Sequence, residues 1–341
     1  KNAHYTDPHI VAAMWSMAER LGFTKGRVLE PSMGSGNFLG MTPSHLRDKT
    51  TFTGVELDNT TGNIAKMLYP DANIHIQGFE ELKAPDGFFD LAIGNVPFGD
   101  YRISDNRYNK LLPQIHNYFF LKALDKVRPG GLVMFITSTG TMDSRRGEDV
   151  RKELAKQADL VSAMRFPAET FGKTALTSVV TDLIILRKRL PGETPKSDAW
   201  VKSSEVADPR GDGYSKIRLN NYFVENPSQI LGDFNGNNRM YPGRANVDRT
   251  DDFEQRLAEA IANLPQDVMS EYSTVRQPRM KEAGMKAKEG GYVVKDGQLL
   301  QNISGGLVEI DATPDRIKRV DGMLKIRDAF DLLIDAEMGR A

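Results

Sequence analysis

The sequence predicts an α/β fold with a parallel sheet and helices on both faces, followed by a smaller mixed α+β region. Strand-like apolar runs alternate with helical stretches through residues 1–190, which is typical of a parallel sheet. Hydrophobic residues make up 40% of the chain and charged residues 27%, so a sizeable core can be buried. The length of 341 residues suits one large domain with an appendage.

The predicted elements begin with a helix from Thr6 to Gly22, because Pro8 suits a first helical turn and the apolar residues after it recur at helical spacing. Strands are expected at residues 27–30, 51–56, 89–94, 132–137 and 181–186. Helical stretches lie between them, among them residues 116–126 and 148–158. These elements define a predicted domain over residues 1–190.

A second region is expected over residues 191–341, after a linker-like segment at 191–195. It should contain a helix at 250–263, a hairpin about Asp296-Gly297 within 290–310, and a last helix at 314–338 with a break at Gly322. We expect this region to contact the substrate or to connect to a neighbouring domain.

The composition excludes several classes of protein. Cysteine is absent, which removes disulfides and thiolate chemistry, and the five histidines form no metal-binding pattern. No apolar run reaches the length of about 20 residues that a membrane span needs, so we expect a cytoplasmic protein without a membrane or metal. The chain begins Lys1-Asn2-Ala3, which suggests a fragment of a longer polypeptide.

A glycine-rich turn follows the first predicted strand, in the run Glu30-Pro31-Ser32-Met33-Gly34-Ser35-Gly36. Such a turn lets the backbone approach a nucleotide-like ligand, although a tight strand-to-helix turn without a ligand shows the same glycines. Glu56 ends the next strand, where a carboxylate can accept both hydroxyls of a ribose. Because Glu30 would repel a phosphate, the pattern favours a ligand with a cationic end and no phosphate, and S-adenosylmethionine has this chemistry.

A second motif, Asn95-Val96-Pro97-Phe98, follows the predicted strand at 89–94. It resembles the (N/D)PP(Y/F) motif of amino-methyltransferases, although a strand that ends in a proline turn with a buried Phe is the structural alternative. With the glycine-rich turn upstream, the motif order over residues 3–189 resembles that of the gamma-type N6-adenine DNA methyltransferases.

The resemblance implies a Rossmann-like class I methyltransferase sheet and S-adenosylmethionine as cofactor. Ala3-His4-Tyr5-Thr6 is similar to the segment that closes over the cofactor, and Phe79-Glu80 falls where the family contacts the adenine ring. The cofactor-binding residues that it implies are Tyr5, Thr6, Glu30, Pro31, Gly34, Gly36, Glu56, Leu57, Phe79, Glu80 and Asn95.

The catalytic residues that the resemblance implies are Asn95, Val96, Pro97 and Phe98. The Asn95 side-chain oxygen and the carbonyl of residue 96 would accept from the adenine amine as it attacks the methyl group. Val96 departs from the family, which usually has proline there, but Pro97 still favours an extended backbone at Val96. Phe98 would stack on the extruded base, with Phe171 as the second wall of the base pocket.

DNA contacts are expected from Tyr101, Arg102, Tyr108 and Lys110, which mix aromatic and basic groups after the catalytic motif. A solvated surface loop would have the same composition.

The sequence therefore predicts methyl transfer to the N6 amine of adenine in DNA, in a modification, restriction or anti-restriction context. A methyltransferase for RNA adenine or protein glutamine, and a non-catalytic binding module, are the alternatives. Residues 222–234 and the final helix are similar to segments of phage and plasmid methylase–helicase fusion proteins, so further domains, with a helicase among them, are expected partners beside DNA.

Overall fold

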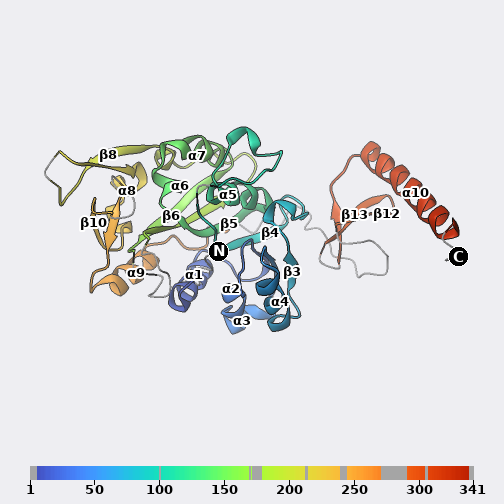
Figure 1. Cartoon of the computed structure of the whole chain (residues 1–341), viewed down its shortest axis with the longest axis horizontal. Helices are drawn as coiled ribbons and strands as arrows, with labels where there is room; N and C mark the ends of the chain where they lie inside the picture. Colours follow the sequence, from blue (N-terminus) through green and yellow to red (C-terminus); the bar gives the residue numbers. More distant parts are fainter. Residues whose placement is uncertain are drawn as a thin grey trace. The chain divides into compact units, whose positions relative to one another are not determined.

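The computed structural model describes residues 6–99, 101–168, 170, 179–211, 214–238, 244–269, 290–303 and 306–337. The chain forms two compact units (Figure 1). The first combines Lys1–Leu82 with Phe89–Tyr272, and the second combines Lys83–Phe88 with Ser273–Ala341.

A seven-stranded sheet in the order β3-β2-β1-β4-β5-β7-β6 is the centre of the first unit. Its strands are β1 (Gly26–Glu30), β2 (Thr50–Glu56), β3 (Asn73–Ile76), β4 (Phe89–Asn95), β5 (Val127–Ser138), β6 (Ala158–Phe166) and β7 (Thr181–Lys188). The five predicted strands are confirmed, whereas β3 and β6 were not predicted. The sheet is mixed rather than wholly parallel, because β7 pairs antiparallel with both β5 and β6.

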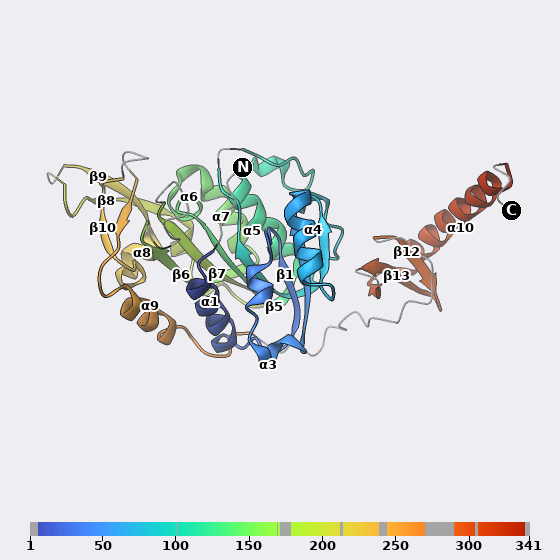
Figure 2. The same ribbon diagram turned by 60° about the horizontal axis from the view of Figure 1, so that its bottom comes forward.

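Helices cover both faces of the sheet, as Figure 2 shows for α1 and α5. The main helices are α1 (Pro8–Arg20), α4 (Asn59–Leu68), α5 (Ile115–Lys126) and α7 (Glu148–Ala155), and the short ones are α2 (Asn37–Gly40), α3 (Ser44–Arg47) and α6 (Gly140–Asp143). Met134 in β5 packs in the hydrophobic core with residues of α1, whereas the ring of its neighbour Phe135 meets Phe120 of α5 at 5.2 Å. Since side chains alternate along a strand, β5 is buried on both faces.

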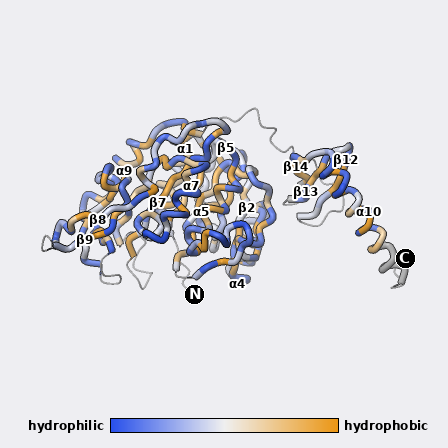
Figure 3. Tube along the Cα trace, turned by 90° about the horizontal axis from the view of Figure 1, so that it is seen from above, coloured by the Kyte–Doolittle hydropathy of each residue, from blue (hydrophilic) through white to orange (hydrophobic). Residues whose placement is uncertain are grey.

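The predicted first helix is confirmed as α1. Asp7 caps it by accepting from the backbone N–H of His9 at 2.8 Å, and Pro8 occupies the first turn. Met14 and Trp15 lie in the core, where apolar residues gather along the central strands (Figure 3).

The segment after residue 190 packs onto the same core. It contains β8 (Ser203–Ala207), β9 (Lys216–Asn220), α8 (Asn221–Glu225), β10 (Asp233–Asn235), β11 (Asn246–Asp248) and the predicted helix, observed as α9 (Phe253–Ala262). Phe253 and Leu257 of α9 are buried in the cluster that contains Met14 and Trp15. The compact unit therefore extends past residue 190, and the boundary predicted there stays a prediction about the methyltransferase domain itself.

The second unit contains β12 (Tyr292–Lys295), β13 (Gln298–Ile303), β14 (Gly306–Ile310) and α10 (Pro314–Glu337). The hairpin about Asp296-Gly297 is confirmed, since both residues have positive φ and β12 pairs antiparallel with β13. The predicted break at Gly322 is wrong. A helical glycine costs only about 1 kcal/mol relative to alanine, which is too little to end a helix of 24 residues.

Across the described ranges, no helix is both long and apolar enough to span a bilayer. The same residues contain no cluster of three or more His, Asp or Glu side chains arranged to hold a metal ion.

Candidate active site

Three predicted site residues meet at one edge of the sheet. Glu30 ends β1, Glu56 ends β2 and Asn95 ends β4, and these neighbouring strands are parallel. Their carboxyl ends therefore lie at the same edge, and the order of the sheet reverses between β1 and β4. In open α/β sheets this switch point is where ligands bind.

The glycine-rich turn is held to β2 by the Glu56 carboxylate. One oxygen of Glu56 accepts from the backbone N–H of Gly34 at 2.9 Å, and the other accepts from that of Asp58 at 2.7 Å. Gly34 and Gly36 have positive φ values of 55° and 89°. A carboxylate has about four acceptor positions, so Glu56 retains capacity for ribose hydroxyls while it anchors the turn.

The glycines of the turn have different structural roles. A Cβ at Gly36 would lie 2.6 Å from the ring of Tyr69, so glycine is needed there for packing. A Cβ at Gly34 would meet nothing within 4 Å, so Gly34 faces open space. Gly36 is therefore explained by packing and Gly34 leaves room for a ligand; no sequence pattern pointed to the role of Tyr69.

Glu30 is a buried carboxylate with an unused acceptor. Its side chain belongs to a residue that is 3% exposed, and its Oε2 has no hydrogen-bond partner. Burial, and then the charge of Glu56, raise the pKa of Glu30 well above its ordinary value, although a hydrogen bond from the backbone of Leu39 acts in the opposite direction. An unpartnered buried carboxylate oxygen fits the cationic end of S-adenosylmethionine.

Asn95 is held from two sides. Its Nδ2 donates to the hydroxyl of the buried Thr6 at 3.2 Å, and its backbone carbonyl accepts from the Ser32 hydroxyl at 2.7 Å. With the amide nitrogen engaged, Oδ1 remains the acceptor. Ser32 was not among the predicted site residues, although its place within the glycine-rich turn was a usable signal.

Val96 uses the one backbone group that the family's usual proline lacks. Its N–H donates to the carbonyl of Ile136 in β5 at 3.1 Å, and its side chain is 1% exposed. Valine thus extends the pairing of β4 with β5 by one bond. Pro97 and Phe98 follow it and are partly buried.

The other predicted cofactor-binding residues, of which Phe79 and Glu80 were expected at the adenine ring, differ in exposure. Leu57 is 70% exposed directly after Glu56, whereas the Phe79 ring is buried and lies 5.0 Å from that of Phe119. The carbonyl of Glu80 accepts from Lys122 at 2.7 Å. Pro31 is buried at the start of the turn.

The predicted DNA-facing residues divide in the same way. Tyr101, Arg102 and Lys110 are exposed. Tyr108 is buried and its hydroxyl donates to Asp125 at 2.6 Å, so its assignment to a DNA-facing surface is corrected to a structural one. Two further predicted residues, Tyr5 and Phe171, lie outside the described part of the chain.

The strand order, with its antiparallel β7, and the site at the β1–β4 switch point are those of the Rossmann-like class I methyltransferase fold. The chain belongs to the N-6 DNA methylase family, whose pattern it matches over residues 1–229. The family implies S-adenosylmethionine as the methyl donor.

Among relatives, the chain is 32% identical over 210 residues to "Defense against restriction protein B" of Escherichia phage P1, a match over 60% of this chain and 9% of that protein. Among solved structures, it is similar to the type I restriction-modification methyltransferase subunit of Streptococcus thermophilus, with 17% identity, a TM-score of 0.48 and coverage of 77% of this chain and 54% of that one. A protein assigned to the class I methyltransferases from Listeria monocytogenes gives 19% identity, a TM-score of 0.48 and coverage of 56% and 63%. The chain thus spans a small part of the phage protein and less than two thirds of each solved chain.

Proposed function

We propose that this chain transfers the methyl group of S-adenosylmethionine to the N6 amine of adenine in DNA. Membership of the N-6 DNA methylase family supports this proposal. The observation that carries it is the anchoring of Asn95, whose amide nitrogen bonds Thr6 and whose carbonyl bonds Ser32, leaving Oδ1 as an acceptor beside the glycine-rich turn.

The cofactor would be held by residues at the ends of β1 and β2. Glu30 supplies a buried carboxylate oxygen for the cationic methionine end, and Glu56 supplies acceptors for the ribose hydroxyls. Leu57, which is exposed next to Glu56, offers an apolar side chain to the adenine ring. Gly34 leaves open space for close approach of the ligand.

The sulfonium supplies an activated methyl group. The exocyclic adenine amine is a poor nucleophile because its lone pair is delocalised into the ring. Asn95 Oδ1 and the carbonyl of Val96 accept from its two hydrogens, which favours a pyramidal nitrogen and stabilises the positive charge that develops. Phe98 stacks on the extruded base and offsets part of the cost of unstacking. The nitrogen loses its proton to solvent only after the transfer. Because no base has to remove it beforehand, orientation of the reactants dominates the rate.

The test is transfer of labelled methyl groups from S-adenosylmethionine to unmethylated duplex DNA, followed by digestion and analysis for N6-methyladenine. The purified 341-residue chain is expected to form this product. Asn95→Ala should abolish transfer while cofactor binding, measured by calorimetry, stays close to that of the parent chain. Asn263→Ala, an exposed substitution at the end of α9, is the matched control and should retain transfer.

The same assay separates the alternative substrates and the non-catalytic module. If RNA or a glutamine-containing protein takes up the labelled methyl group and DNA does not, the proposed substrate is refuted. A folded chain that binds cofactor and transfers nothing to any of these acceptors would refute the enzymatic proposal.

We further propose that the activity serves restriction or anti-restriction modification, and that the chain works beside other domains of a longer polypeptide, with a helicase among them. The similarity to the phage protein named for defence against restriction supports this context. Residues 191–341 would then contact DNA or connect to those domains.

A further inference from the structure

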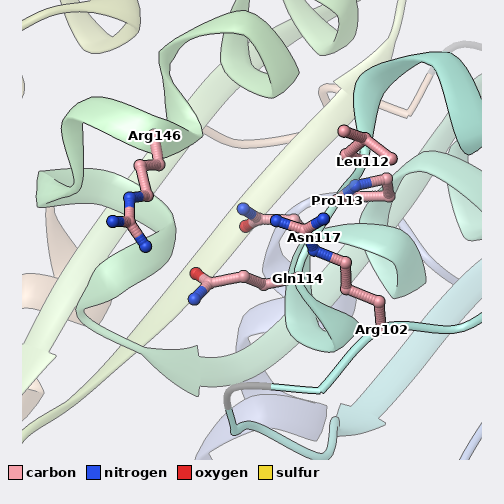
Figure 4. A pocket seen from close by; sticks show the side chains of 6 residues that line it. All are labelled: Arg102, Leu112, Pro113, Gln114, Asn117 and Arg146. Carbon is pink, nitrogen blue, oxygen red and sulfur yellow. The ribbon is translucent and has the colours of Figure 1, made fainter.

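A pocket of about 180 Å³ lies between the start of α5 and the segments that hold Arg102 and Arg146. It is lined by Arg102, Leu112, Pro113, Gln114, Asn117 and Arg146 (Figure 4), none of which carries a negative charge. This volume is below the range of about 300–1,000 Å³ for sites of drug-sized ligands, so the pocket has room for part of a larger ligand.

The pocket belongs to the same sheet edge as Asn95. Arg102 follows the carboxyl end of β4, and the carbonyl of Tyr101 accepts from the N–H of Ile115 at 3.1 Å, which fixes this segment to the start of α5. Arg146 lies in the turn after α6, which follows the carboxyl end of β5. Arg102 is four positions after Phe98 in the sequence, so at about 3.5 Å per residue the two Cα atoms lie within about 14 Å of each other.

The two arginines of the pocket have no anionic partner within the described part of the chain, where the structure gives neither guanidinium a hydrogen-bond acceptor. The neighbouring arginines differ. Arg145 pairs with Glu205 at 3.2 Å, and Arg107 pairs with Asp125 at 2.9 Å. Arg102 and Arg146 are thus exposed cations that approach one pocket from two elements.

Asn117 adds a different requirement. The residue is 2% exposed, and its Oδ1 has no hydrogen-bond partner. A buried acceptor without a donor is costly, and a phosphate cannot satisfy it because a phosphate diester has no donor. The pocket therefore calls for a ligand that joins an anion to an N–H donor.

We propose that this pocket takes in part of a nucleotide next to the target adenine on the same DNA strand, with phosphates of that strand on Arg102 and Arg146 and a base N–H donating to Asn117. A nucleotide carries both an anionic phosphate and a base edge with donors, and the pocket lies one short segment from Phe98. This inference rests on the proposed function, because it takes DNA as the substrate.

The test is the salt dependence of DNA binding by the full chain. Binding is measured as the change in fluorescence anisotropy of a short labelled duplex. Arg102→Gln and Arg146→Gln should each lower the slope of log affinity against log salt concentration by about 1, the value for one lost phosphate contact. Arg145→Gln removes an adjacent arginine outside the pocket and should leave the slope unchanged. Asn117→Leu, which keeps the side-chain volume, should weaken binding about fivefold without a change in slope.

Cofactor affinity and methyl transfer are measured on the same variants. If Arg146→Gln gives the same slope as Arg145→Gln, or if the parent chain binds no DNA, the pocket proposal is overturned whatever the methyl-transfer assay shows. If the slope falls as expected but the parent chain forms no N6-methyladenine, the pocket stands and the proposed reaction fails. Unchanged cofactor affinity in Asn117→Leu shows that its weaker DNA binding does not come from misfolding.

Discussion

Replacement of Glu30 by glutamine is expected to weaken cofactor binding while it stabilises the empty protein. Glutamine keeps the shape and one oxygen for the Leu39 backbone bond, but it removes the charge and directs an amide toward the cationic ligand. A hydrogen bond to a charged group contributes about 1.5–3 kcal/mol, so the Kd for S-adenosylmethionine should rise by about tenfold to about a hundredfold.

The stability change has the opposite sign, because Glu30 is a buried carboxylate beside the charge of Glu56. Its pKa in the folded protein lies well above the ordinary value of 4.5, so between these two values the folded state binds more protons than the unfolded chain. The free energy of unfolding of the empty protein should therefore fall as pH rises through this window and level off above the folded pKa. Glu30→Gln should lose this pH dependence and be at least as stable as the parent chain at neutral pH.

Calorimetric titration measures the affinity, and urea denaturation across the pH range measures the free energy of unfolding. Glu225→Gln is the matched control, since Glu225 is exposed and lies in α8. In the parent chain, cofactor affinity should rise with pH through the same window, because the ligand needs the ionised carboxylate. A Glu30→Gln protein with the parent's cofactor affinity, or one that is clearly less stable at neutral pH, would refute the reasoning.

Three further predictions concern the turn and the sheet. Gly36→Ala should lower the free energy of unfolding by about 2 kcal/mol or more, from left-handed strain plus the clash described above, whereas Gly34→Ala should cost only the strain of about 1 kcal/mol, as compared by chemical denaturation. Ser32→Ala removes the bond to the carbonyl at the end of β4 and should lower kcat by up to about tenfold with little effect on cofactor Kd, so an unchanged kcat would count against a positioning role. Asp182→Asn removes one of the two carboxylates on the buried Arg165 and leaves Asp143 at 2.9 Å, so it should cost about 1.5–3 kcal/mol by urea denaturation; equal stability would show that the Asp182 pair contributes little.

Much of the sheet could be predicted because its strands have strong local patterns. The buried run of β4 and the apolar end of β5 are continuous hydrophobic stretches, which is what a strand covered on both faces requires. β3 was missed because four residues with mixed polarity give no periodicity. In β6, Asp159 and Arg165 interrupt the apolar pattern, and their pairing with Arg189 and Asp182 is visible only in three dimensions.

The site could be predicted to the extent that its motifs are local. Glu30, Glu56 and Asn95 were found from their places at strand ends, and the parallel sheet brings them to one edge. The bonds that hold Asn95 could not be predicted, because its partners Thr6 and Ser32 are 89 and 63 residues away in sequence.

The position of β7 between β5 and β6 has a consequence for synthesis on the ribosome. β6 is made first, yet within the sheet it pairs with β7 alone, which is made later. Until β7 emerges, the open edge of β5 and the nine residues of β6 have no native strand to pair with. A nascent chain that stalls between these two strands would therefore expose two unpaired edges, and this interval is where chaperone binding or aggregation during translation should concentrate.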